Sequence, residues 1–186
     1  MTTTVVRPNV LATALPKLYA ARFAFAVVWA LLLVLTADTL GPLGVALLLL
    51  YPVVDLAAAV VDHRASRATG PARALVVNMA LSLLAAIGLA FAAASGKPAV
   101  LAVWGAWALT AGIVQLVVAV SRRALGGQWP LVASGGISAL AGIAFLVQSA
   151  GSNPSLTALA GYAALGGVFF LVSALRLRRS AASTAR

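Results

Sequence analysis

The residue best suited to chemistry in this chain is Asp55. The 186 residues include only three acidic side chains and one histidine. Asp55 lies within a strongly apolar stretch, where an ionised carboxylate costs roughly 2.5–3.5 kcal/mol on membrane-insertion scales and therefore needs a partner or a proton. Two interpretations follow: a site that takes up and releases a proton, or a protonated side chain that hydrogen-bonds to a neighbouring helix and stabilises its packing.

Other polar side chains in apolar stretches extend this candidate site. Tyr51 precedes Asp55 by one helical turn, and the neutral amides of Asn78 and Gln115 could hydrogen-bond between helices. We take Asp55, Tyr51 and Gln115 as the candidate proton or polar site. Six aromatic residues are candidate anchors at the membrane interface where they lie near a span end, namely Tyr19, Tyr51, Trp104, Trp107, Trp129 and Tyr162. The sequence leaves open whether Tyr51 and Trp107 lie inside the bundle instead.

Asp62 follows Asp55 by seven residues and so shares a similar helix face. We expect it to form an interfacial ion pair with one of three basic residues, namely Arg64, Arg22 or Arg73. The chain has no cysteine, only three acidic residues and one histidine. These side chains are too few to form a metal site, so we expect no metal and no cofactor. The chain also lacks a nucleophile with a base, paired carboxylates and a phosphate-binding glycine loop, so we expect no enzyme activity.

The composition is that of a membrane protein. Hydrophobic residues make up 63% of the chain, charged residues 9%, and the mean hydropathy is +1.07, whereas a soluble domain carries about a quarter charged residues. A membrane-spanning helix needs about 20 apolar residues. Six runs approach or reach this length, at 18–36, 43–61, 74–95, 100–120, 130–150 and 156–175. The sequence predicts an all-α protein with six transmembrane helices.

The basic residues predict the orientation of these helices. If every run crosses the bilayer, Lys97 is the only one of the 13 lysines and arginines on its side. The positive-inside rule then places both termini in the cytoplasm. The net charge of +10 does not indicate nucleic-acid binding, because the basic residues fall in small groups between apolar runs. We expect the helices to contact the lipid bilayer and the basic ends to contact anionic lipids. Helix faces made of small residues could pack against a second copy of the chain or against a partner membrane protein.

A repeat underlies the six runs. Pro42, Pro98 and Pro154 are 56 residues apart, and each precedes an aromatic residue by eight or nine positions, at Tyr51, Trp107 and Tyr162. We interpret the chain as three parallel helical hairpins, at about 18–64, 73–123 and 128–179, around a pseudo-threefold axis along the membrane normal. They form one transmembrane domain, 18–175, between an N-terminal segment, 1–17, and a basic tail, 176–186. The glycines expected at helix contacts are Gly88, Gly112, Gly142 and Gly167.

These motifs resemble those of the HdeD-like acid-resistance membrane proteins. The resemblance rests on the aromatic-to-glycine segments 107–112 and 162–167, the turn prolines and the basic ends of the hairpins. In the segment at Tyr51, Asp55 is kept but Leu56 replaces the glycine. The resemblance implies a non-enzymatic protein of the bacterial inner membrane linked to acid or general stress. The alternatives are a small proton-linked transporter or channel that uses Asp55, and an accessory subunit of a larger membrane complex.

Overall fold

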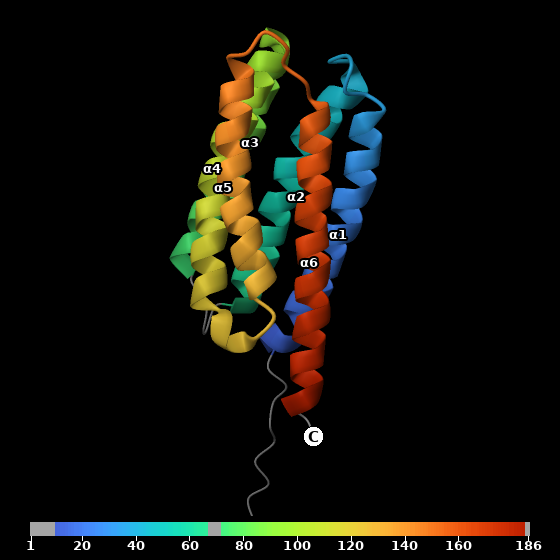
Figure 1. Cartoon of the computed structure of the whole chain (residues 1–186). Coiled ribbons are helices and arrows are strands. Elements are labelled where there is room, and N and C mark those ends of the chain that lie inside the picture. The colour runs from blue at the N-terminus through green and yellow to red at the C-terminus, as the bar shows by residue number, and fades with distance from the viewer. Residues whose placement is uncertain (1–9, 67–71, 185–186) are drawn as a thin grey trace, which may run out of the picture.

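The computed structural model describes residues 10–66 and 72–184, which form an up-and-down bundle of six long helices (Figure 1). A short 3₁₀ turn, η1 (Arg123–Leu125), precedes the fifth helix. All six helices are long and apolar enough to cross a membrane, so the chain is an all-α, multi-pass membrane protein. The helices are α1 (Val10–Val34), α2 (Pro42–Ser66), α3 (Ala72–Ser95), α4 (Lys97–Ser121), α5 (Trp129–Ser149) and α6 (Thr157–Thr184).

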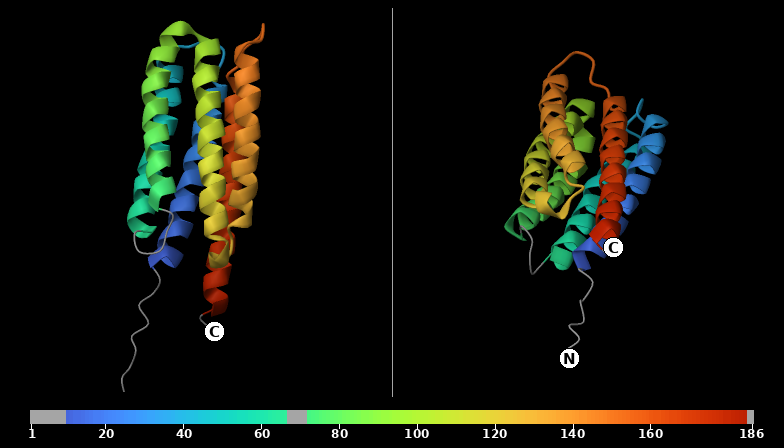
Figure 2. Two further views of the ribbon diagram at one scale, coloured as in Figure 1. Left: turned by 90° about the vertical axis from the view of Figure 1, so that its left-hand side faces the viewer. Right: turned by 60° about the horizontal axis from the view of Figure 1, so that its bottom comes forward.

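Two helices extend beyond the expected spans. The first begins at Val10, inside the N-terminal segment 1–17, and the last continues to Thr184, so most of the basic tail is helical. The end of α6 projects past the other helices (Figure 2). Arg7, Arg67 and Arg186, three of the basic residues expected in the cytoplasm, lie outside the described residues.

Glycine and proline explain two of the connections. Gly96 alone separates α3 from α4, with a φ of 96° that an L side chain rarely adopts, and Pro98 occupies the first turn of α4. Gly126 and Gly127, with φ values of 73° and 62°, reverse the chain between η1 and α5.

The connections define the two ends of the bundle. The start of α1, the end of α2, the start of α3, the α4–α5 connection and the end of α6 lie at one end, which we call the terminal end (Figures 1 and 2). The other three connections lie at the far end. Arg176, Arg178 and Arg179 are exposed in the terminal part of α6, whereas Lys97 lies at the far end and donates a 2.8 Å hydrogen bond to the carbonyl oxygen of Asp38.

The helices form a closed ring, because each packs against the next and α6 packs against α1. The most extensive contacts join α4 to α5, where glycines let the backbones approach closely. A Cβ atom built on Gly142 would lie 2.4 Å from the backbone nitrogen of Leu109, and one on Gly112 would lie 2.7 Å from that of Ala139. Gly88 and Gly167 instead face side chains, at 3.1 Å from Val103 and 3.0 Å from Ala26.

Two apolar clusters fill the bundle, and between them lies the region described below. The larger cluster occupies the far half and includes Trp29 and Trp104, whose stacked rings have centroids 5.4 Å apart. The smaller cluster lies toward the terminal end and includes Tyr19, Leu131 and Phe170. Large apolar side chains also cover the outside, where Phe91 is 75% and Leu140 69% exposed. Such a surface suits contact with lipid tails.

Candidate functional site

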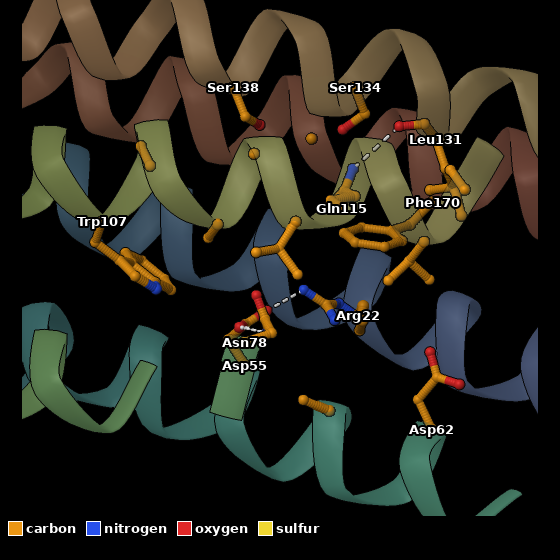
Figure 3. A pocket seen from close by; sticks show the side chains of 18 of the residues that line it. Arg22, Asp55, Asp62, Asn78, Trp107, Gln115, Leu131, Ser134, Ser138 and Phe170 are labelled. Carbon is orange, nitrogen blue, oxygen red and sulfur yellow. Dashed lines mark hydrogen bonds and ion pairs between the residues drawn. The ribbon is translucent and has the colours of Figure 1, made fainter. Parts of the chain in front are cut away.

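Asp55 lies on the inner face of α2 and is 8% exposed. Its Oδ1 atom accepts a hydrogen bond from the guanidinium of Arg22 in α1. Its Oδ2 atom accepts two more from α3, at 2.9 Å from Asn78 Nδ2 (Figure 3) and 2.7 Å from Ser82 Oγ. These three donors come from two other helices, so the Asp55 side chain joins α2 to both α1 and α3. The buried charge therefore has a partner, which the sequence required but did not identify.

Arg22 reaches Asp55 from the first half of α1. Its guanidinium carbon lies 4.2 Å from the ring centroid of Phe170 in α6, which is within the range of a cation–π contact. A guanidinium stays charged at any physiological pH. Arg22 therefore brings a permanent positive charge into the membrane span and links three helices, α1, α2 and α6.

The ion pair lines a central cavity to which all six helices contribute. The space for the centres of water molecules is about 90 Å³, which is enough for a few waters or a small solute. Its wall is unusually polar for an apolar chain. The polar and aromatic residues that line it are Tyr19, Arg22, Tyr51, Asp55, Asp62, Asn78, Trp107, Gln115, Ser134, Ser138, Tyr162 and Phe170 (Figure 3).

Aromatic side chains form the part of the cavity wall nearest the far end. Tyr51 contacts Trp107 edge to face, with ring centroids 6.0 Å apart. Tyr162 donates a 3.1 Å hydrogen bond to Ser138 Oγ, and Trp107 Nε1 lies 3.4 Å from Ser82 Oγ. Beyond these rings the apolar cluster around Trp104 fills the bundle.

Several hydrogen-bonding groups in the cavity are partly or wholly unused. Ser134 is 3% exposed, and its hydroxyl points toward the cavity without a hydrogen bond to another described residue (Figure 3). The Tyr51 hydroxyl likewise has no hydrogen-bond partner among the described residues. Gln115 Nε2 makes one long hydrogen bond, at 3.4 Å, to the carbonyl oxygen of Leu131. These groups are available to a bound molecule.

A second ion pair lies nearer the terminal end and corrects one expectation. Asp62 pairs with Arg122, just after α4, and not with Arg64, Arg22 or Arg73. Two guanidinium nitrogens of Arg122 lie 2.8 and 2.7 Å from the two oxygens of Asp62, and Ser66 contacts both side chains. The three expected partners lie on α1, α2 and α3, but the up-and-down packing of the helices brings the end of α4, with Arg122, beside the end of α2.

The environment of Arg122 is strongly desolvated, with 3% of the side chain exposed. Burial by itself lowers the pKa of Arg122, but the hydrogen bonds and negative charge of Asp62 outweigh burial and raise the pKa above its usual value. The ion pair between Asp62 and Arg122 therefore links α2 to the end of α4. Asp62, but not Arg122, lines the cavity.

The structure decides where the aromatic residues lie. Trp104 is fully buried, Trp107 and Tyr19 are 7% and 4% exposed, and Tyr51 and Tyr162 face the cavity. Only Trp129 among the six is largely exposed, at 65%, as an interfacial anchor would be.

Sequence reasoning missed Ser82, Ser134 and Arg122 as parts of polar sites. The 56-residue spacing of the turn prolines held a signal for the first two, because Arg22, Asn78 and Ser134 are also 56 residues apart, as are Ser82 and Ser138. Aligning the whole chain at that interval would have placed them at equivalent positions. Arg122 carried no comparable signal.

Within residues 10–66 and 72–184, no three His, Cys, Asp or Glu side chains group as metal ligands would. Comparisons with protein-family models, curated proteins and solved structures found no match to this chain.

Proposed function

We propose that the protein is a small proton-linked membrane transporter in which Asp55 takes up and releases the proton. The observation that supports this is the position of a buried carboxyl group, beside an arginine, in a cavity lined by all six helices. Intramembrane ionisable residues that face a bundle interior commonly mark solute or proton pathways. A purely structural ion pair does not need the adjacent empty space.

The closed far end favours a transporter over an open channel. The cavity stops at a dry cluster that contains Trp29, Leu101 and Trp104, each at most 1% exposed. A solute would cross this region only if the helices repacked. Transport would therefore proceed by alternating exposure of the cavity to the two sides of the membrane.

Protonation of Asp55 provides the energetic basis for such a rearrangement. Removing one partner of a buried ion pair costs about 3–5 kcal/mol, because the other charge is left without compensation. A proton on Asp55 has this effect on Arg22. The two protonation states therefore favour different arrangements of α1, α2 and α3, the helices that the site joins.

Proton movement in reconstituted vesicles tests the proposal. Purified protein would be incorporated into vesicles that hold a pH-sensitive dye, and gradients of small anionic, cationic, zwitterionic and neutral solutes would be applied in turn. At least one solute gradient should change the internal pH faster than in protein-free vesicles. The Asp55→Asn variant should abolish this change.

Asp38→Asn is the matched control, because it removes the same charge from an exposed turn at the far end. It should leave the rate unchanged. The proposal fails if no solute moves protons above the protein-free rate, or if Asp55→Asn and Asp38→Asn behave alike while both remain folded.

We also propose that the bundle is built from three parallel hairpin repeats around a pseudo-threefold axis. Cavity-lining residues support this, because they recur in register on the odd-numbered helices at Tyr19, Leu75 and Leu131 and at Arg22, Asn78 and Ser134. The even-numbered helices agree, with Tyr51, Trp107 and Tyr162 lining one level of the cavity. In this arrangement the ion pair arises where one repeat carries charges and the other two carry neutral residues.

For the cellular setting, we propose a bacterial inner membrane with both termini in the cytoplasm and a contribution to survival in acid. The resemblance to HdeD-like proteins supports the setting, and a proton-binding residue gives it a physical basis. A deletion strain should survive exposure to low pH less well than its parent, and a plasmid copy should restore survival where an Asp55→Asn copy does not. Equal survival of the deletion strain and its parent would contradict this role.

A further inference from the structure

The charges in the central cavity indicate what kind of solute it accepts. Each carboxyl group already accepts three hydrogen bonds, one or two of them from an arginine: Asp55 accepts from Arg22, Asn78 and Ser82, and Asp62 accepts from Arg122 and Ser66. A cation entering the cavity would therefore find no free carboxylate. The groups left for a ligand include the guanidinium of Arg22 and the hydroxyls of Tyr51 and Ser134, which are all able to donate hydrogen bonds.

We propose that the transported solute is a small monovalent anion that replaces Asp55 as the partner of Arg22 when Asp55 becomes protonated. This inference rests on the proposed transport function. In the resting state the guanidinium and the carboxylate compensate each other. When the carboxylate takes up a proton, the partly buried positive charge of Arg22, whose side chain is 22% exposed, needs a new partner, and an anion supplies it without a second unpaired charge.

Charge balance then couples the two ligands. The site changes from a guanidinium with a carboxylate to a guanidinium with a bound anion and a neutral carboxylic acid, so one proton and one monovalent anion enter together. Each ligand favours binding of the other, as reciprocity of coupled equilibria requires. Because no net charge moves, transport should not depend on membrane voltage.

The other charged groups around Asp55 leave this balance intact. The titratable groups near it are Arg22 and Tyr19 on α1, Tyr51 and Asp62 on α2, and Tyr162 on α6, whereas the cavity-lining residues of α3, α4 and α5 are uncharged. Asp62 is held by Arg122 through two hydrogen bonds. Asp55 and Arg22 are therefore the pair whose charges a ligand can rearrange.

Charge and volume limit the anion. Arg22 is the only basic residue among those that line the cavity, so a second negative charge would have no partner. The space of about 90 Å³ accommodates an ion of a few non-hydrogen atoms. Ser134 faces this space from α5 with an unused hydroxyl, and we assign it as a donor to the bound anion (Figure 3).

The experiment uses the full chain in vesicles at equal internal and external pH, with an internal pH-sensitive dye. Inward gradients of chloride, nitrate or pyruvate should acidify the interior, and a gradient of the bulky anion gluconate should not. The acidification should persist when the membrane voltage is clamped at zero with potassium and valinomycin. Asp55→Asn and Arg22→Gln should each abolish it, and Asp38→Asn should not.

Because single changes at a buried ion pair can prevent folding, Ser134→Ala serves as a milder variant. It should raise the anion concentration for half-maximal acidification about tenfold, as expected for the loss of one hydrogen bond to a charged group. The adjacent exposed position, Ala133→Ser, is its matched control and should leave that concentration unchanged.

The outcomes separate this inference from the transport proposal. Acidification or alkalinisation driven only by a cationic, zwitterionic or neutral solute would overturn the anion inference and leave proton-linked transport standing. Anion-driven acidification that Ser134→Ala leaves unchanged would remove Ser134 from the site. The absence of any solute-driven proton movement would overturn both proposals.

Discussion

Replacement of Gly142 by alanine tests the closest helix contact in the bundle. The added Cβ would lie 2.4 Å from the backbone nitrogen of Leu109 and 2.6 Å from the carbonyl oxygen of Gly105. Both atoms belong to the backbone of α4, which cannot rotate aside as a flexible side chain would. We therefore expect α4 and α5 to separate, at a cost of about 1–3 kcal/mol from overpacking.

Gly136 in the same helix provides the control, because nothing lies within 4 Å of a Cβ atom built there. Alanine favours a helix over glycine by about 1 kcal/mol, so Gly136→Ala should be neutral or stabilising. The two variants make the same chemical change and gain the same helix propensity, which cancels in their difference, so their free energies of unfolding should differ by the overpacking cost of about 1–3 kcal/mol.

The measurement is denaturant unfolding in detergent micelles, followed by circular dichroism, for both variants and the unmodified protein. If Gly142→Ala is as stable as Gly136→Ala, the close contact between α4 and α5 is wrong. If both variants are destabilised equally, helix packing near Gly136 must differ from that described above.

The other predictions concern the second ion pair and the orientation of the bundle. Asp62→Asn and Arg122→Gln should each lower the free energy of unfolding by about 3–5 kcal/mol, because each leaves a buried charge unpaired. The double variant should lose much less stability than the sum of the two single variants. Strict additivity in this double-mutant cycle would exclude the ion pair. The chain has no cysteine, so single cysteines can map its topology. A membrane-impermeant maleimide would be added to intact cells with permeabilised outer membranes. It should label the Ser152→Cys variant but not the Arg179→Cys variant. Labelling of both variants, or of Arg179→Cys alone, would contradict the prediction that both termini lie in the cytoplasm.

Much of the fold could be predicted from the sequence because lipid imposes a simple rule on the chain. Every backbone polar group in the bilayer must be paired within the segment, so a long apolar run must be a helix. That rule predicted six spans, and the structure has six helices of suitable length and composition. The helix ends were less predictable, since Val10 and Thr184 lie outside the apolar runs that gave the signal.

The candidate site was only partly predictable. The cost of a charge in an apolar span singled out Asp55 and required a partner for it, and these conclusions depend on residue type alone. The identity of the partner depends on which helix faces meet. Arg22 is 33 residues from Asp55 and Arg122 is 60 residues from Asp62, so local spacing could not identify either pair.

The sequence by itself thus determined the membrane environment, the helices and the need to compensate the charge of Asp55, because each follows from local composition and the properties of lipid. Only the tertiary structure decided that α6 closes the ring against α1, that Arg22 and Arg122 are the partners, and that a polar cavity lies between two apolar clusters. These features depend on the rotation and depth of each helix relative to its neighbours. Small-residue contacts such as Gly142 against Gly105 set that geometry, and they act between segments far apart in the chain.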